Sequence, residues 1–379
     1  MANANSLAYN VASFICALFV LEYGADKFID HTAIVAERTG IPESVIGLLT
    51  AGAEWEELAV VVICILRNRS SLAIGNIIGS SISNILGAFS LGLIFRSNEE
   101  DVVFDSSARL YTLVMLLVTC LIVGLQFVDS SVLFRISGGI LIVIFVLYVS
   151  SVAYLIFKGR LVAPESDSDC DSEDDENNIA NDVSSARVDS ITPLLAAERT
   201  MSSSRHKHRI AYHVAFLLLG FLAILLSSFV LSDASSSIAE GCGLSEVLFG
   251  VVFLSIATTL PEKFIAVISG SRNRTGILVA NTVGSNIFLL TLCMGVLWVS
   301  MAGSFDRGTV DVIELSVLLG SSSFMTLIVW FGAQWLRIAG SIMLVGYLGF
   351  LVLEFTIIHR DNTQSHPIQS TKFQLFRHA

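Results

Sequence analysis

Long apolar stretches alternate with short polar connections along most of this chain. Each stretch holds about 20 residues, the length that an α-helix needs to cross the hydrocarbon core of a bilayer. Half of the stretches precede a polar segment in the middle of the chain and half follow it. The pattern predicts an all-α polytopic membrane protein with about ten transmembrane helices. The expected spans are 7–24, 44–66, 72–95, 108–127, 132–157, 210–231, 246–269, 275–301, 311–333 and 338–358.

The polar segment between the two sets of spans, 159–209, is rich in Ser, Asp, Glu and Asn. It has too little apolar surface to form a core and is predicted to be a disordered cytosolic linker. The chain therefore divides into a first five-helix repeat at 1–158, this linker, a second five-helix repeat at 210–358 and a polar tail at 359–379. The bias of Lys and Arg toward the cytosolic side places the N-terminus outside.

Composition narrows the possible classes of function, and the sequence shows where the negative charge lies. The 379 residues are 54% hydrophobic and 15% charged, with a net charge of −11, which excludes a soluble enzyme and argues against a nucleic-acid-binding protein. Much of the negative charge lies in the linker run 165–176, which holds eight acidic residues and no basic one. This run fits a flexible tether, and its serines could be substrates of a kinase. The six cysteines form no C-x-x-C pair, so neither a disulfide framework nor a zinc site is expected.

The two halves of the membrane part repeat each other in sequence. Because each half has an odd number of spans, the halves enter the membrane in opposite directions. Inverted repeats with interrupted polar segments at matching positions are typical of transporters that bind their substrate near the membrane midplane. Chance similarity between apolar helices is the alternative, but three pairs of segments match at nearly constant spacing. These pairs are 40–47 with 243–250, 52–57 with 257–262, and 75–82 with 280–287.

Two glutamates, Glu57 and Glu262, lie at matching positions within apolar stretches. A carboxylate at such a depth costs at least ~2.5 kcal/mol, which makes it a candidate for function, although a structural carboxylate paired with a neighbour has the same pattern. Pro261 interrupts the helix beside Glu262 and frees backbone carbonyls. With the hydroxyls of Thr258 and Thr259, these oxygens suit a hard cation such as Ca²⁺ or Na⁺.

Two segments with the pattern Asn-x-x-Gly-Ser or its close variant supply the opposing wall of this expected site. Their small residues let helices approach closely, and plain helix packing with interhelical amide bonds is the alternative reading. The neutral oxygen ligands that these segments offer are Ser80, Ser285, Asn76, Asn281, Asn84 and Asn286.

The second-repeat motif Ala-Thr-Thr-Leu-Pro-Glu at 257–262 resembles the Gly-Thr-Ser-Leu-Pro-Glu motif of the calcium/cation antiporter superfamily, the sodium/calcium exchanger membrane domain. The resemblance covers nearly the whole membrane part of the chain. It implies ten helices, a Ca²⁺ site formed by both repeats, and exchange for Na⁺, K⁺ or H⁺ by alternating access. It also assigns Glu57 and Glu262 to the two central carboxylates, and Ser80, Asn84 and Ser285 to flanking ligands. No cofactor other than the transported ions is expected.

The chain departs from the family pattern in both repeats. Ala53 and Glu54 stand where Thr and Ser are usual, and Leu289 stands where the second repeat often has Asp or Asn. The first repeat thus lacks the hydroxyl ligands that the family pattern implies for Na⁺. Glu54 and Glu57 share one helical face, so we hypothesise that Glu54 restores the carboxylate lost at Leu289. Three clustered carboxylates repel one another, which would favour proton coupling over Na⁺ coupling.

The sequence therefore predicts a secondary antiporter that exchanges Ca²⁺, or a similar divalent cation, for H⁺ or Na⁺. The alternatives are a K⁺-dependent or other monovalent-coupled exchanger, and a relative that has lost transport and serves as a membrane regulator. An enzyme is not expected, because no nucleophile–base pair or metal-binding His pair occurs in the spans. The expected partners are the bilayer of the plasma membrane or of an organelle such as the vacuole or ER, Ca²⁺, and a monovalent counter-ion. Charges at the membrane edge, which more often anchor helix ends than line an ion path, are Glu22, Asp26, Asp30, Glu314 and Lys263.

Overall fold

The computed structural model of the protein confirms the all-α class. Every regular element in the described part of the chain is a helix, and no strand occurs there. The expected linker run 165–176 and the tail from 359 onward lie outside the described residues. The structure describes residues 2–38, 54–97, 104–126, 131–158, 194–300, 310–331 and 335–358.

The helices agree with the predicted spans. Within the described residues, 8 helices are long and apolar enough to cross a membrane, and a bent pair provides a ninth candidate. The remaining predicted span, 44–66, is described only from Glu54 onward, where α3 (Trp55–Leu66) forms its second part. The other outer helices are α6 (Ser106–Leu125), α7 (Ser131–Phe157), α14 (Val312–Phe331), α15 (Leu336–Leu353) and its π-helical extension η5 (Glu354–Ile358).

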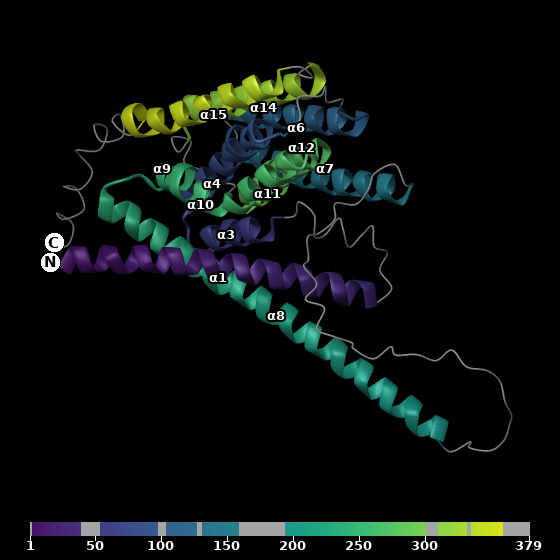
Figure 1. The fold of residues 1–379 in the computed structure, drawn as a ribbon. Coiled ribbons are helices and arrows are strands. Elements are labelled where there is room, and N and C mark those ends of the chain that lie inside the picture. Colours follow the sequence, from purple (N-terminus) through teal and green to yellow (C-terminus); the bar gives the residue numbers. More distant parts are fainter. Residues whose placement is uncertain are drawn as a thin grey trace.

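The first helix of each repeat is much longer than its apolar stretch. α1 (Ala2–Arg38) and α8 (Leu194–Cys242) contain no proline, and α8 ends where Gly243 adopts a left-handed φ of 69°. Since α8 begins at Leu194, the last part of the predicted linker is helical rather than disordered. Figure 1 shows α1 and α8 crossing on one side of the molecule, with α14 and α15 on the opposite side. Gly24 and Gly220 allow the close crossing.

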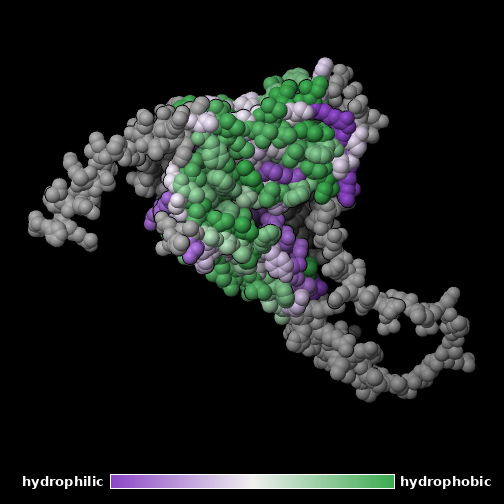
Figure 2. Space-filling view, turned by 60° about the vertical axis from the view of Figure 1, so that its left-hand side comes forward, coloured by the Kyte–Doolittle hydropathy of each residue, from purple (hydrophilic) through white to green (hydrophobic). Residues whose placement is uncertain are grey.

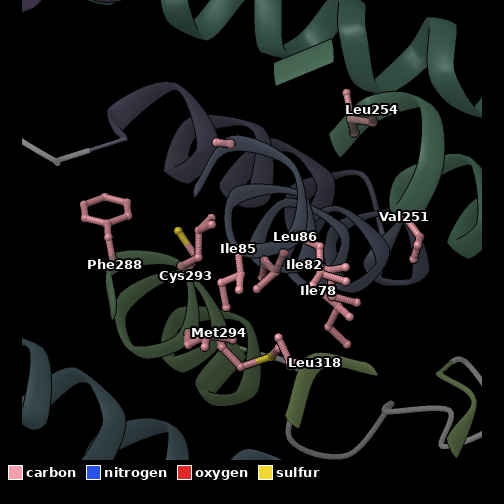
Figure 3. Packing of buried hydrophobic residues seen from close by; sticks show 14 of the residues in the cluster. Ile78, Ile82, Ile85, Leu86, Val251, Leu254, Phe288, Cys293, Met294 and Leu318 are labelled. Atoms are coloured by element: carbon pink, nitrogen blue, oxygen red, sulfur yellow. The ribbon is translucent and has the colours of Figure 1, made fainter. Parts of the chain in front are cut away.

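The centre of the molecule is formed by the third span of each repeat. In the most apolar windows of these two spans, 89% and 83% of the residues are buried inside the protein, against at most 50% in the other spans that consist of a single helix. Figure 3 shows part of the resulting core, where Ile78, Ile82 and Ile85 lie in the same cluster as Met294 and Leu318. The central elements are α4 (Ser70–Ile82), η1 (Ser83–Phe89) and α5 (Ser90–Ile94), and α12 (Thr275–Ile287), η3 (Phe288–Cys293) and α13 (Met294–Ser300).

Both central spans change from α- to π-helix at the same point of the repeat. η1 begins at Ser83 and η3 begins at Phe288, each shortly after the Gly-Ser pair of its polar segment. π-helical turns are rare and often occur at functional sites, because they shift the side chains that follow. The repeated π-helical turns therefore make the two central spans candidates for a functional role.

The surface of the helical bundle is largely apolar. Large hydrophobic side chains on the outer helices are exposed, among them Phe19, Leu117, Leu147 and Phe331. Figure 2 shows that hydrophobic residues dominate one face, with hydrophilic residues gathered at its margins and in a smaller patch near its middle. A surface of this kind fits contact with lipid rather than water.

A further repeat in sequence becomes visible in the backbone. Arg-Asn-Arg occurs at 67–69 and again at 272–274, and the central residues Asn68 and Asn273 have φ values of 56° and 55°. Asn is one of the few residues that adopts this left-handed conformation readily. The two turns link α3 to α4 and α11 (Leu260–Ser271) to α12, so they occupy the same place in each repeat.

Candidate functional site

The central glutamates lie at the beginnings of two short helices. Glu57 is in the first turn of α3, and Glu262 is in the first turn of α11. The chain bends by 48° between Glu246–Thr258 and α11, where Pro261 occupies the start of the new helix. The positive end of a helix dipole favours a carboxylate in the first turn. The elements before this bend are α9 (Glu246–Leu248), η2 (Phe249–Leu254) and α10 (Ser255–Thr258).

Glu57 is bound by side chains of the central span of its own repeat. It is 1% exposed, and its two carboxylate oxygens accept hydrogen bonds from the amide of Asn76 and, at 3.1 Å, from the hydroxyl of Ser80. Thr258 of the second repeat also reaches this carboxylate. The structure thus joins Glu57 to three of the predicted ligands, and one of them comes from the other half of the chain.

Glu54 and Glu262 are the other two carboxylates of the predicted site. Glu54 is 4% exposed, accepts a hydrogen bond of 3.4 Å from the Asn84 amide, and contacts Ser285 of the second repeat. Glu262 is 8% exposed and lies close enough to both Glu54 and Glu57 for electrostatic interaction. The three glutamates are therefore near enough to interact electrostatically with one another.

Several buried oxygens around these glutamates have no hydrogen-bond donor among the described residues. An unsatisfied buried polar atom costs about 1–3 kcal/mol, so a cluster of such atoms calls for a ligand. No group of three or more Asp, Glu, His or Cys side chains in the described residues is placed to hold a metal ion alone. A cation here would instead share carboxylate, amide and hydroxyl oxygens, as hard cations do. The unsatisfied oxygens are Glu54 Oε2, Asn76 Oδ1, Asn84 Oδ1, Glu262 Oε2 and Asn286 Oδ1.

Some of the predicted ligands are less well placed than their partners in the other repeat. Asn281 is only partly buried, whereas the matching Asn76 is fully buried. The amide of Asn286 donates to the Thr282 carbonyl of its own helix at 2.7 Å, which leaves its oxygen available. Leu289 is buried in the apolar core, so the second repeat has no polar side chain at that point.

The five charges predicted at the membrane edge form three groups. Asp30 and Glu314 are bonded away from the central glutamates, Glu22 and Asp26 of α1 interact toward Glu262, and Lys263 belongs to the site itself. Asp30 pairs with Lys27 at 3.7 Å, and Glu314 accepts a hydrogen bond from the Asp311 backbone at 2.9 Å, away from the central glutamates. Glu22 of α1 lies near enough to Glu262 to interact with it electrostatically. Asp26, one turn further along α1, interacts in the same way with Glu22.

Lys263 forms part of the site in a way that the sequence does not predict. Its ammonium group donates to the Ser83 hydroxyl at 2.9 Å and to the Thr259 carbonyl at 3.1 Å, and it also reaches the Thr259 hydroxyl. Tyr347 of α15 donates to the same Ser83 hydroxyl at 3.0 Å. Ser83 lies one turn after Ser80 on the central span, so a search for hydroxyls one turn beyond the Gly-Ser pair would have found it.

Comparison with known proteins agrees with this architecture. The family model described as sodium/calcium exchanger protein matches residues 9–154 and 212–356, which together form most of the chain and coincide with the two repeats. The inner membrane protein YrbG of Escherichia coli K12 is 25% identical over 323 residues, 84% of this chain and 88% of that protein. The sodium/calcium exchanger MaX1 of Methanosarcina acetivorans is 23% identical over 378 residues, 93% of this chain and 100% of that protein.

A solved structure shows the same fold. The sodium-calcium exchanger NCX_Mj, in a crystal soaked with Na⁺ and Sr²⁺, superposes with a TM-score of 0.54 at 20% sequence identity. The match covers 91% of this chain and 98% of that one. The chain therefore belongs to the sodium/calcium exchanger protein family and is an integral multi-pass membrane transporter, not an enzyme.

Proposed function

We propose that the protein is a secondary antiporter that moves Ca²⁺, or a similar divalent cation, in exchange for H⁺ or Na⁺. The observation that carries this proposal is the cluster of buried, unsatisfied oxygens around Glu54, Glu57 and Glu262. Carboxylate oxygens supply the charge, and amide and hydroxyl oxygens complete the shell that a hard divalent cation prefers.

The origin of these oxygens suggests how the ion crosses. Glu54, Asn76 and Asn84 come from the first repeat, whereas Glu262 and Ser285 come from the second. An ion held between two inverted repeats is released to one side or the other when one repeat moves against its partner. Because occupied and empty sites differ in charge repulsion, ion binding can bias that movement.

Two features favour H⁺ over Na⁺ as the counter-ion. The first repeat has Ala53 and Glu54 where the family pattern has hydroxyl residues, which removes neutral Na⁺ ligands and adds an ionisable group. In the second repeat, the Thr259 hydroxyl is already engaged by Lys263 and Ser83. A carboxylate that releases Ca²⁺ can accept a proton in its place, which allows exchange at one site.

The test is radioactive Ca²⁺ uptake by proteoliposomes that contain the full-length protein. Gradients of Na⁺, K⁺ and pH are imposed one at a time, with the membrane potential held at zero. We expect the pH gradient to drive uptake, and Glu57→Gln and Glu262→Gln to abolish it. Glu314→Gln, a buried carboxylate away from the site, is the matched control and should retain uptake.

The other outcomes separate the alternatives. Uptake driven by Na⁺ or K⁺ without pH dependence would overturn proton coupling and support a monovalent-coupled exchanger. Ca²⁺ binding without uptake under any gradient would indicate a regulatory relative, in which Leu289 has weakened the site. Absence of both uptake and Ca²⁺ binding would overturn the proposed function.

A further inference from the structure

Lys263 is held in the interior by oxygen atoms of both repeats rather than by a carboxylate. Its ammonium group has three oxygen neighbours, the Thr259 carbonyl, the Thr259 hydroxyl and the Ser83 hydroxyl. Thr259 and Lys263 belong to the second repeat, and Ser83 begins η1 in the first. None of the ion pairs within 4 Å that the described residues form involves Lys263.

The hydrogen bonds around this ammonium group are complete. Ser83 accepts from Lys263 and from Tyr347 and can donate its own proton to the Thr259 hydroxyl, 2.9 Å away. The Thr259 hydroxyl in turn donates to the Ser255 carbonyl. Each hydroxyl therefore uses one donor and two acceptor positions, which is its full capacity.

The helix η1 also leaves room for the Lys263 side chain. Gly87 lies one turn beyond Ser83, and a Cβ atom there would be 3.3 Å from Lys263 Cε. A lysine at the margin of an apolar region normally extends its ammonium group toward water. Lys263 instead extends across the interface between α11 and η1, next to Glu57 and Glu262, which interact with it electrostatically.

We propose that Lys263 is a specificity-determining residue whose ammonium group occupies a monovalent-cation position between the two repeats. The hydroxyl and carbonyl oxygens of Ser83 and Thr259 coordinate this tethered cation as they would coordinate Na⁺ or K⁺. A mobile monovalent ion is thereby excluded from this position, and the transported ions are left to the neighbouring carboxylates. The inference rests on the proposed function, because it presumes that those carboxylates bind the transported cation.

Removal of the Lys263 ammonium group should allow a mobile Na⁺ or K⁺ ion to bind between Ser83 and Thr259. In Lys263→Met the side chain keeps the length of its aliphatic part and loses the ammonium group, so the oxygens of Ser83 and Thr259 lose Lys263 as a donor. The purified full-length protein is melted in detergent with NaCl, KCl or N-methyl-D-glucamine chloride at one ionic strength. We expect the wild-type melting temperature to be the same in all three salts. Lys263→Met should show saturable stabilisation by Na⁺ or K⁺ that the organic cation does not produce.

Three controls make the result specific. Lys27→Met removes a partly exposed lysine from α1 and should show no such stabilisation. Adding Ser83→Ala to Lys263→Met removes one oxygen ligand. The half-saturating concentration of Na⁺ or K⁺ should then rise at least tenfold. Lys263→Gln is measured alongside, so that poor recovery of one variant leaves the other.

The proposal would be overturned if neither Lys263 variant responds to Na⁺ or K⁺, or if wild type already responds as they do. A CaCl₂ titration of the same proteins separates this failure from failure of the proposed function. Wild type stabilised by Ca²⁺, with the effect lost in Glu262→Gln, upholds the carboxylate site whatever Lys263 does. Ca²⁺ stabilisation that persists in Glu262→Gln overturns the proposed function itself.

Discussion

The two repeats share their backbone but surround their central glutamates differently. Glu57 accepts hydrogen bonds from Asn76 and Ser80, which hold it in one orientation. In the second repeat, Asn281 is partly exposed and Glu262 Oε2 is unsatisfied among the described residues. The repeated backbone thus sets where the carboxylates lie, whereas the individual side chains decide which one is fixed and which one is available.

The two repeats also differ at their margins. On α8, Asp233 binds Arg67 at 2.9 Å and Arg69 at 3.0 Å, which ties this helix to the end of α3. The matching residue of α1 is Asp30, which precedes Gly40 by the same spacing as Asp233 precedes Gly243. Asp30 pairs instead with Lys27 of its own helix. In an inverted-repeat transporter, such a difference between halves is expected to reverse when the site opens to the other side.

The largest effect is expected where the repeats pack backbone to backbone. A Cβ atom at Gly75 would lie 2.5 Å from the Val247 carbonyl oxygen, while the matching residue of the second repeat is already Ala280. Gly75→Ala should destabilise the protein by about 3 kcal/mol, since backbone atoms must move. Thermal melting in detergent measures this. Gly276→Ala is the matched control because nothing lies within 4 Å of its Cβ, and an equal loss there would contradict the packing argument.

The next effect tests the difference between the two asparagines. Asn76→Ala removes the amide that orients Glu57, and we expect Ca²⁺ to bind about tenfold more weakly, ~1.4 kcal/mol. Asn281→Ala should change Ca²⁺ affinity by less than about twofold, ~0.4 kcal/mol, because Asn281 is partly exposed. Equilibrium binding of radioactive Ca²⁺ measures both. Equal losses in the two variants would show that the repeats contribute alike, against the asymmetry described above.

The smallest effect concerns the ion pairs at the margins. Asp233→Asn should lower stability by at most ~1 kcal/mol, because the pair with Arg67 and Arg69 is partly exposed and screened by water. Asp30→Asn should have a still smaller effect, since its pair with Lys27 is long, at 3.7 Å, and involves a single partner. Urea or thermal unfolding compares the two variants. A larger loss in Asp30→Asn would mean that α1, rather than α8, is the tied helix.

Much of the fold follows directly from hydropathy. Apolar windows of span length locate the helices, because a chain in a bilayer must satisfy its backbone hydrogen bonds internally. The extent of α1 and α8 is not predicted, because charged residues such as Asp26 and Asp30 lower hydropathy without breaking a helix. The 67–69 and 272–274 turns were predictable, since Arg-Asn-Arg stands in both repeats.

The candidate site is predicted in part. Glu57, Glu262 and Glu54 are recognisable because charge is costly in apolar sequence. The network of Ser83, Lys263 and Tyr347 is not, because its members come from three distant segments and meet only through tertiary packing. The π-helical turns in η1 and η3 likewise depend on packing and leave no pattern in local sequence.

The central claim is that both repeats contribute to one divalent-cation site. Equilibrium binding of radioactive Ca²⁺ to the purified wild type, Glu57→Gln and Glu262→Gln tests it most directly, with Glu314→Gln as the control. We predict that each of the two central substitutions weakens binding by at least about 100-fold, ~2.7 kcal/mol, while the control binds as wild type does. Wild-type affinity in either Glu57→Gln or Glu262→Gln would contradict a site shared by the two repeats.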